Sequence, residues 1–254
     1  MTTGSDPAEA PVDVVAWHDT ECGAYSADLG LWDALARKAP GPLLELGSGT
    51  GRVALHLARA GREVIAVERE PELAAELERR AASAGVELTV IAADIRELQP
   101  GSIQVAPALV IAPMHVVQTF DRHGRRDLIE AAALLLAAGG TLALVVIDEV
   151  HSTKLASGDP LLLPDIREIG GWVFSSEPLW VQVTEEKITA RRLRRRVAPG
   201  GELESSVHED VLHRTPPEEL EQLGAELGLR IREREMIRSS PIESDSIVVI
   251  LERP

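Results

Sequence analysis

The chain has 254 residues, 44% of them hydrophobic, which is enough to bury a sizeable core. Its 41 acidic side chains outnumber the 26 Lys and Arg side chains, and the net charge of −15 disfavours a nucleic-acid partner. The single cysteine, Cys22, excludes an internal disulfide. The polar first residues and short apolar runs predict neither a signal peptide nor a membrane span. We therefore expect a cytoplasmic protein with no membrane partner.

The first forty residues predict a tail followed by a helical segment. Residues 1–12 are rich in Gly, Ser, Pro and acidic side chains, a composition typical of a disordered tail. Apolar residues then recur at helical spacing over residues 14–38, and the sequence Pro40-Gly41-Pro42 ends that pattern. We expect residues 13–40 to form an N-terminal helical segment.

Buried strands alternate with helices across residues 41–151. Such alternation indicates parallel β-α-β units, so we expect an α/β fold with a doubly wound, mostly parallel sheet. The expected strands are 43–46, 63–67, 86–91, 108–112 and 141–147, and the expected helices are 52–60, 72–84 and 125–138.

The pattern changes after the fifth strand. Long alternating segments and the Gly200-Gly201 pair predict an inserted antiparallel sheet over residues 152–214. The core then comprises residues 41–151 and 215–254, and two terminal strands bring its sheet to seven. The expected inserted strands are 171–175, 179–184, 187–197 and 202–213, followed in the core by a helix over 217–227 and strands over 230–236 and 246–251.

The stretch of residues 43–53 is the most informative part of the sequence. A short apolar strand is followed by Gly47, Gly49 and Gly51 and then by apolar residues at helical spacing. Glycines let the backbone turn sharply and approach a ligand closely. Because the turn leads into a helix, its free N–H groups favour an anion or a polar ligand edge. Many α/β proteins carry a glycine-rich loop, so the surrounding residues decide the interpretation.

Carboxylates follow the next two strands. Ligands of open parallel sheets bind outside the carboxyl ends of the strands. Glu68 ends the second strand, about twenty residues beyond the glycines, where a carboxylate can accept hydrogen bonds from both ribose hydroxyls. Asp94 follows the third strand, where it can accept from an exocyclic adenine amine. These positions predict a nucleoside-containing ligand.

Two other nucleotide-binding classes lack their signatures here. A nicotinamide dehydrogenase has a third glycine where Arg52 stands, and a short-chain dehydrogenase also needs Tyr-x-x-x-Lys. Tyr25 is the only tyrosine, and Leu29 stands four residues later. A P-loop would need Gly-Lys-Ser or Gly-Lys-Thr, which the sequence does not contain.

The sequence instead resembles class I S-adenosylmethionine-dependent methyltransferases. The segment Glu-Leu-Gly-Ser-Gly-Thr-Gly at 45–51, Glu68, Ala-Asp-Ile at 93–95 and Gly-Gly-Thr at 139–141 fall where that family has its motifs. The resemblance spans roughly residues 40–150 and implies a Rossmann-like methyltransferase fold. More loosely, residues 209–220 resemble the return from an inserted sheet in small-molecule methyltransferases, including those acting on amino sugars and natural products. In such enzymes an N-terminal helix serves as a lid, which implies that role for residues 13–40.

The resemblance also implies how S-adenosylmethionine would bind. The loop residues would lie against its methionine part, with Glu45 orienting the ammonium group, and Glu68 would hold the ribose diol. Asp94 and the Ile95 N–H would bind the adenine, which Arg69 would cover, and Ala112 would lie beside the reacting methyl group. The implied cofactor-binding residues are Glu45, Gly47, Ser48, Gly49, Glu68, Arg69, Asp94, Ile95 and Ala112.

Methyl transfer by in-line displacement needs a base only if the acceptor arrives protonated, and histidine suits that task. His115 and His151 follow the fourth and fifth strands and are the candidate catalytic residues. The candidate substrate contacts are His18, Tyr25 and Trp172. We expect no metal site.

The acceptor is expected to be a small molecule methylated on N or O. The sequence Ala112-Pro113-Met114-His115 stands where enzymes that methylate base amino groups often carry Asn/Asp-Pro-Pro-Tyr/Phe. The arginine-rich run at 191–196 is either a solvated strand surface paired with acids or a wall that binds an anionic substrate. The inserted sheet could also form a homodimer interface. The alternative function is a catalytically inactive S-adenosylmethionine-binding partner or sensor.

Overall fold

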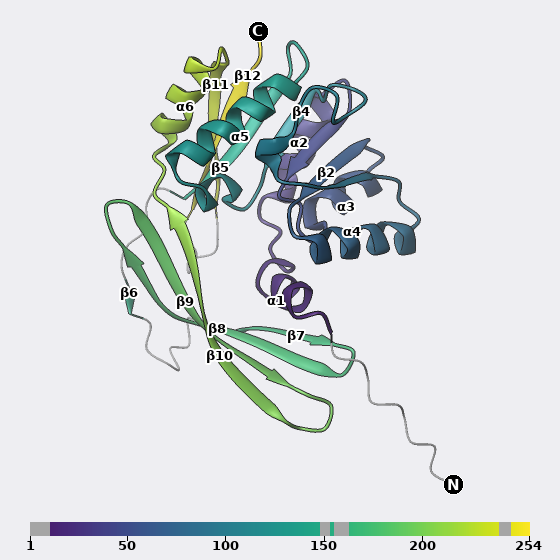
Figure 1. Ribbon diagram of the computed structural model, residues 1–254, viewed down its shortest axis with the longest axis vertical. Coiled ribbons are helices and arrows are strands. Elements are labelled where there is room, and N and C mark those ends of the chain that lie inside the picture. The colour runs from purple at the N-terminus through teal and green to yellow at the C-terminus, as the bar shows by residue number, and fades with distance from the viewer. Residues whose placement is uncertain (1–10, 148–152, 155–162, 239–244) are drawn as a thin grey trace. The chain divides into compact units, whose positions relative to one another are not determined.

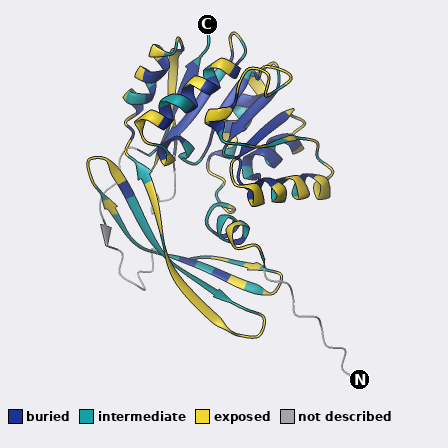
Figure 2. Cartoon of the chain, in the orientation of Figure 1, coloured by how far each residue is buried: buried dark blue, intermediate teal, exposed yellow. Residues whose placement is uncertain are grey.

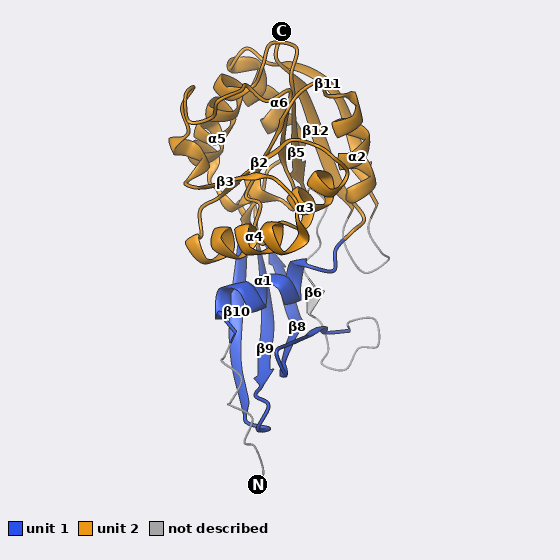
Figure 3. Ribbon diagram, turned by 90° about the vertical axis from the view of Figure 1, so that its right-hand side faces the viewer, with its two compact units in different colours: residues 1–25, 151–183, 189–211 blue, residues 26–150, 184–188, 212–254 orange. Residues whose placement is uncertain are grey.

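A computed structural model describes residues 11–147, 153–154, 163–238 and 245–254 (Figure 1). The chain divides into two compact units (Figure 3). Unit 1 comprises residues 1–25, 151–183 and 189–211, and unit 2 comprises residues 26–150, 184–188 and 212–254.

A seven-stranded sheet with the order β11-β12-β5-β4-β1-β2-β3 forms the centre of unit 2. Strands β1 to β5 run parallel, whereas β12 pairs antiparallel with both β5 and β11. The doubly wound, mostly parallel α/β fold predicted from the sequence is therefore confirmed. The strands are β1 (Leu43–Leu46), β2 (Val64–Glu68), β3 (Thr89–Ala92), β4 (Leu109–Ala112), β5 (Thr141–Val146), β11 (Arg230–Ile237) and β12 (Ser246–Glu252).

Helices cover both faces of this sheet, with α2 packed beside α3 and α5 beside α6 (Figure 1). All residues of β1, β2 and β4 are buried, as expected of central parallel strands (Figure 2). The helices are α2 (Leu29–Lys38), α3 (Arg52–Arg59), α4 (Pro71–Ala84), α5 (Arg122–Leu135) and α6 (Pro217–Glu226), with 3-10 turns η1 (Ile95–Glu97) and η2 (Val116–Thr119).

Two predicted boundaries in the first half of the chain were wrong. The single helix expected over residues 14–38 is two helices, because α1 (Asp13–Cys22) ends before Gly23 and α2 begins only at Leu29. The strand expected over 86–91 begins only at Thr89. Gly85 ends α4 in a left-handed conformation, and the Val86 N–H still bonds back to that helix.

Unit 1 contains a five-stranded antiparallel sheet on which α1 packs. The ring of Trp17 on α1 meets Phe174 edge to face, with the centroids 5.0 Å apart. The turn predicted at Gly200-Gly201 connects β9 to β10, and Gly201 has a φ of 94°. The strands are β6 (Thr153–Lys154), β7 (Asp165–Ile169), β8 (Trp172–Val183), β9 (Lys187–Val197) and β10 (Leu203–His213).

The segments expected as separate strands at 171–175 and 179–184 form one strand, β8. Pro178 interrupts the sequence pattern between them but not the strand. It lies between the part of β8 that pairs with β7, up to Ser176, and the part that pairs with β6, from Trp180. Its missing N–H therefore costs no hydrogen bond to either strand. The sequence pattern also missed β6 and β7.

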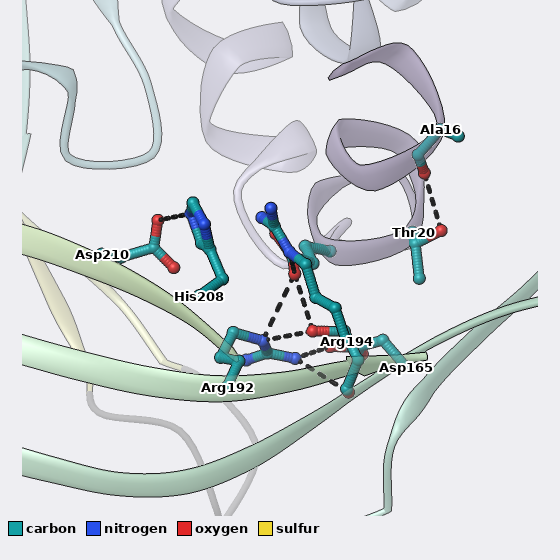
Figure 4. Close-up of polar contacts among 9 residues, drawn as sticks. Ala16, Thr20, Asp165, Arg192, Arg194, His208 and Asp210 are labelled. Carbon is teal, nitrogen blue, oxygen red and sulfur yellow. Dashed lines mark hydrogen bonds and ion pairs between the residues drawn. The ribbon is translucent and has the colours of Figure 1, made fainter. Parts of the chain in front are cut away.

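Each arginine of the 191–196 run pairs with an acid inside unit 1, which agrees with the paired-surface interpretation. Arg194 meets Glu21 at 2.6 Å, and Arg192 meets Asp165 (Figure 4). Burial raises the pKa of Glu21, but hydrogen bonds from Arg194 and Ser176 outweigh it and lower that pKa on balance. The remaining pairs are Arg191–Glu209, Arg195–Glu177, Arg196–Asp13 and Arg196–Glu204.

Gly51, the residue just before α3, has a φ of 94°, and a Cβ added there would overlap Leu77 Cδ1. Gly51→Ala should therefore lose about 1–2 kcal/mol from the left-handed conformation and a further 1–3 kcal/mol, roughly, from overpacking. Gly61→Ala is the matched control, because Gly61 has a φ of 79° and no described atom within 4 Å of its added Cβ. Urea unfolding of both variants measures the difference. Equal losses would contradict the packing at Gly51.

Candidate functional site

The carboxyl end of β1 lies at the point where the order of the sheet reverses. From β1 the chain proceeds outward on one side to β2 and β3, whereas β4 pairs on the other side of β1. Open α/β sheets bind ligands at such a switch point. The predicted glycine loop follows β1 directly, so it lies where the topology favours a ligand.

The glycine loop is fastened to the end of β2. The N–H groups of Gly47 and Ser48 both bond to the Val67 carbonyl, at 2.9 and 3.0 Å. Gly47 has a φ of 70°, and a Cβ added to it would lie 2.7 Å from Val116 Cγ2. Glycine at this position is thus required both by the backbone conformation and by the close approach of η2.

Glu68 is the carboxylate that holds this arrangement. Its Oε2 accepts a hydrogen bond from the Gly49 N–H at 2.8 Å, and its Oε1 accepts one from the Glu70 N–H at 2.8 Å. Each carboxylate oxygen can accept more than one hydrogen bond. Glu68 can therefore hold the loop and still receive hydroxyl donors from a ligand.

Glu45, in the middle of the buried β1 strand, is an unusual core residue. Its side chain accepts a hydrogen bond from the Ala54 N–H in the first turn of α3. Its Oε2 is buried and has no hydrogen-bond partner among the described residues. Burial raises the pKa of Glu45 to about 8, although the positive charge of Arg52 opposes the rise. The loop thus has an unsatisfied acid beneath it, and an entering cation could stabilise that acid.

Asp94 begins η1 after β3 and is paired within its own turn. It accepts hydrogen bonds from the Arg96 side chain, at 2.9 and 2.7 Å, and from the Arg96 N–H. The Arg96 guanidinium holds the pKa of Asp94 at about 2. Ile95 is buried and Arg69 is exposed. The roles of these residues toward adenine stay predictions.

The turn after β4 presents His115. Ala112 is buried at the strand end, and Met114 and His115 follow with φ values of 48° and 63°. Such left-handed conformations are uncommon for side chains of this size. His115 Nε2 lies 2.9 Å from the Ser246 hydroxyl at the start of β12.

Burial lowers the pKa of His115 to about 4, against the opposing charge of Asp28. The imidazole is therefore neutral near pH 7, with one nitrogen able to donate and the other able to accept. A group with so low a pKa is a weak base, so it is better suited to orienting a polar acceptor than to removing its proton.

The structure brings together the loop residues Gly47, Ser48 and Gly49 with Glu68, and it places Glu45 directly before the loop. The sheet order sets the ends of β4, β1, β2 and β3 side by side. His18, Tyr25 and Trp172 belong to unit 1, and their role in substrate binding stays a prediction. His151 lies outside the described residues.

Sequence reasoning missed two features of the site. Ser246 gave no local signal, since it meets His115 only because β12 inserts beside β5. Asp28 was also missed, although it forms a buried pair with Arg52 at 2.6 Å and accepts a hydrogen bond from the Trp32 indole at 2.8 Å. An acid before an amphipathic helix predicts a helix cap and not an ion pair.

Other site classes find no support in the described part of the chain. No group of three or more His, Cys, Asp or Glu side chains there could hold a metal ion. No helix among the same residues has the length and apolar character needed to cross a membrane.

Residues 43–140 match the family model of a methyltransferase domain. The chain thus carries a methyltransferase domain that contains the glycine loop, Glu68, Asp94 and His115, and the predicted resemblance is confirmed over this region. A search of curated protein sequences finds no match.

Solved methyltransferase structures share the fold over nearly the whole chain. The sugar N-methyltransferase KedS8 from Streptoalloteichus sp ATCC 53650 is 17% identical, with a TM-score of 0.69 over 100% of this chain and 99% of that chain. CalS10, an amino pentose methyltransferase from Micromonospora echinaspora solved with S-adenosylmethionine, is 17% identical, with a TM-score of 0.67 over 98% and 100%. The CcbJ methyltransferase from Streptomyces caelestis is 22% identical, with a TM-score of 0.66 over 89% and 88%. At these identities the likeness establishes the fold.

The low pKa of His115 predicts a pH-dependent stability. In the unfolded chain His115 takes up a proton below its ordinary pKa of about 6.5. In the folded chain it takes up that proton only near pH 4. The free energy of unfolding should therefore fall as the pH drops through this window, by at most about 3 kcal/mol from this residue. Urea unfolding at pH 7 and pH 5 measures the loss.

His115→Gln should lose less stability on acidification than the unsubstituted protein. His123→Gln removes an imidazole that is 85% exposed in the same unit, and it should keep the original pH dependence. If both variants responded to acid alike, the burial of a neutral His115 would be contradicted.

Proposed function

We propose that this protein transfers a methyl group from S-adenosylmethionine to nitrogen or oxygen of a small-molecule acceptor. The observation that carries the proposal is the bond from the Gly49 N–H to Glu68, which shapes the loop of the methyltransferase domain around a buried carboxylate. The unpartnered oxygen of Glu45 adds a place for a cationic group beside the same loop.

The sheet order suggests how the cofactor would lie. Going from β4 through β1 and β2 to β3, the residues near the carboxyl ends of the strands are Ala112, Glu45, Glu68 and Asp94 in turn. Along the extended ligand the ammonium group, the ribose and the adenine follow one another, which suits Glu45, Glu68 and Asp94 in that order. The sulfonium methyl, which lies between the ammonium group and the ribose, would then face Ala112 on the neighbouring strand. In this proposal the Ile95 N–H binds the adenine ring and Arg69 covers one face of it.

The cofactor, when bound, supplies a methyl group that its sulfonium already activates. The protein's task is then to align the acceptor atom with the methyl carbon and the sulfur, and such positioning can supply on the order of 7–11 kcal/mol. Glu45 would hold the ammonium group and Glu68 would hold the ribose, so the ligand is fixed on both sides of the sulfonium. The buried strand ends beneath them keep this alignment rigid.

On the acceptor side, His115 would orient the acceptor through its neutral imidazole, held by Ser246. His151 remains a candidate base, and His18, Tyr25 and Trp172 remain candidate acceptor contacts. KedS8 is a sugar N-methyltransferase and CalS10 is an amino pentose methyltransferase, so amino sugars are the first acceptors to test.

We also propose that the enzyme is cytoplasmic and that it forms a homodimer through the inserted sheet. Its edge strand β10 carries exposed apolar side chains at every fourth residue, namely Leu203, Val207 and Val211. Light scattering should then give twice the chain mass of 27.4 kDa. A monomeric mass would remove the dimer from the proposal without affecting methyl transfer.

Glu68→Ala tests the cofactor site. Loss of charged hydrogen bonds to the ribose should weaken S-adenosylmethionine binding by about 1–3 kcal/mol, measured by calorimetry. Glu87→Ala removes an exposed carboxylate of the same unit and should leave the affinity unchanged. Thermal melting of each variant controls for folding. Unchanged affinity in Glu68→Ala would contradict the ribose assignment.

His115→Ala should leave cofactor affinity within about twofold and lower the rate of methyl transfer, because the residue serves the acceptor. A large loss of cofactor affinity would remove it from the acceptor pocket. Cofactor binding with no turnover on any acceptor would instead favour an inactive binding partner or sensor.

A further inference from the structure

A buried ion pair includes Arg52, the residue that directly follows the glycine loop, and has no part in the function proposed above. Asp28 is 1% exposed, and its carboxylate accepts hydrogen bonds from both terminal nitrogens of Arg52, at 2.6 and 2.7 Å. The Trp32 indole also donates to it at 2.8 Å. This bidentate pair ties the start of α2 to the first residue of α3, immediately after the loop.

Glu45 shares this electrostatic environment. The charged groups that act on it are Arg52, Asp28 and Glu68. Besides Glu45 itself, two of these groups are carboxyl groups, and one of them, Asp28, already holds the Arg52 guanidinium in a bidentate pair. Glu68, in turn, accepts two backbone N–H groups. Glu45 has one backbone N–H and an oxygen with no partner among the described residues.

Of the three carboxyl groups, Glu45 is thus the one least compensated as an anion. A buried carboxylate without a paired cation is costly, and the group takes up a proton instead. Burial raises the pKa of Glu45 to about 8, which agrees with a neutral acid at pH 7 in the empty loop.

We propose that Asp28 is a positioning residue that keeps Glu45 protonated in the empty loop by holding the Arg52 guanidinium in a bidentate pair, so that a ligand carrying an ammonium group binds there with release of one proton. The inference rests on the proposed function, because it requires the methionine end of the cofactor to reach Glu45. The O–H bond of Glu45 breaks, its proton passes to the buffer, and the ammonium group keeps its own protons and becomes the partner of the carboxylate.

This linkage makes the ligand's amino group a condition for tight binding at neutral pH. Below pH 8 each ligand must displace a proton, so the affinity should rise about tenfold per pH unit between pH 6 and pH 7.5. It should level off near pH 8, where free α-amino groups also begin to lose their proton.

Calorimetry of S-adenosylhomocysteine binding at pH 6.5, in buffers of different ionisation enthalpy, counts the protons released. We expect about one proton per site. The matched control ligand is methylthioadenosine, which keeps the adenosine and the sulfur but lacks the amino-acid part, and it should release none. Zero protons, or uptake of a proton, on S-adenosylhomocysteine binding would overturn the inference.

Glu45→Gln should abolish proton release and flatten the pH dependence of affinity, whereas Glu87→Gln, an exposed carboxyl in the same unit, should change neither. If Glu45→Gln still released a proton, another group would be the source and the inference would be wrong. The ligand comparison decides the same point in the unsubstituted protein if this variant does not fold.

Asp28→Asn tests the positioning role. Removing the carboxylate leaves the Arg52 charge available to Glu45, so proton release at pH 6.5 should fall well below one, and the rise in affinity should move to lower pH. A purely structural role would weaken binding equally at all pH values, and that result would overturn the positioning assignment. Binding without proton release refutes this inference alone, whereas no binding of S-adenosylhomocysteine refutes the proposed function as well.

Discussion

The hydrogen bond between the Gly49 N–H and the Glu68 carboxylate is the interaction on which the site depends. It joins the loop after β1 to the end of β2 at 2.8 Å, and the second oxygen of Glu68 accepts the Glu70 N–H just before α4. Hydrogen bonds to a charged acceptor are stronger than neutral ones. One buried carboxylate therefore shapes the loop before any ligand arrives, and a preformed loop lowers the ordering cost of binding.

The acidic side chains near the loop differ in whether their carboxyl oxygens have partners. Glu68 is satisfied by backbone N–H groups, and Asp28 is satisfied by Arg52 and Trp32. Asp94 is satisfied by Arg96. Glu45 alone among these four has an oxygen without a partner in the described structure. The position of this unsatisfied acid, beside a glycine loop at the switch point of the sheet, explains why we assign it to the cationic end of the ligand.

The sequence predicted most of the core correctly because each strand and turn there is encoded by the residues of its own segment. Fully buried parallel strands read as apolar runs, and the glycines mark left-handed turns at fixed positions. Long-range contacts had no such signal, and His115 and Ser246 are 131 residues apart in sequence. The break at Gly23 was missed because apolar residues continue on both sides of it. The continuity of β8 was missed because Pro178 interrupts the sequence pattern, and only the assembled sheet places this residue between the segments that pair with β7 and β6.

A crystal structure of the protein with S-adenosylhomocysteine tests the central claim most directly. We predict the methionine part against Gly47 and Gly49, the amino group within hydrogen-bonding distance of Glu45, and both ribose hydroxyls on Glu68. A ligand bound elsewhere, with the glycine loop empty and the bond from Gly49 to Glu68 unchanged, would contradict the account.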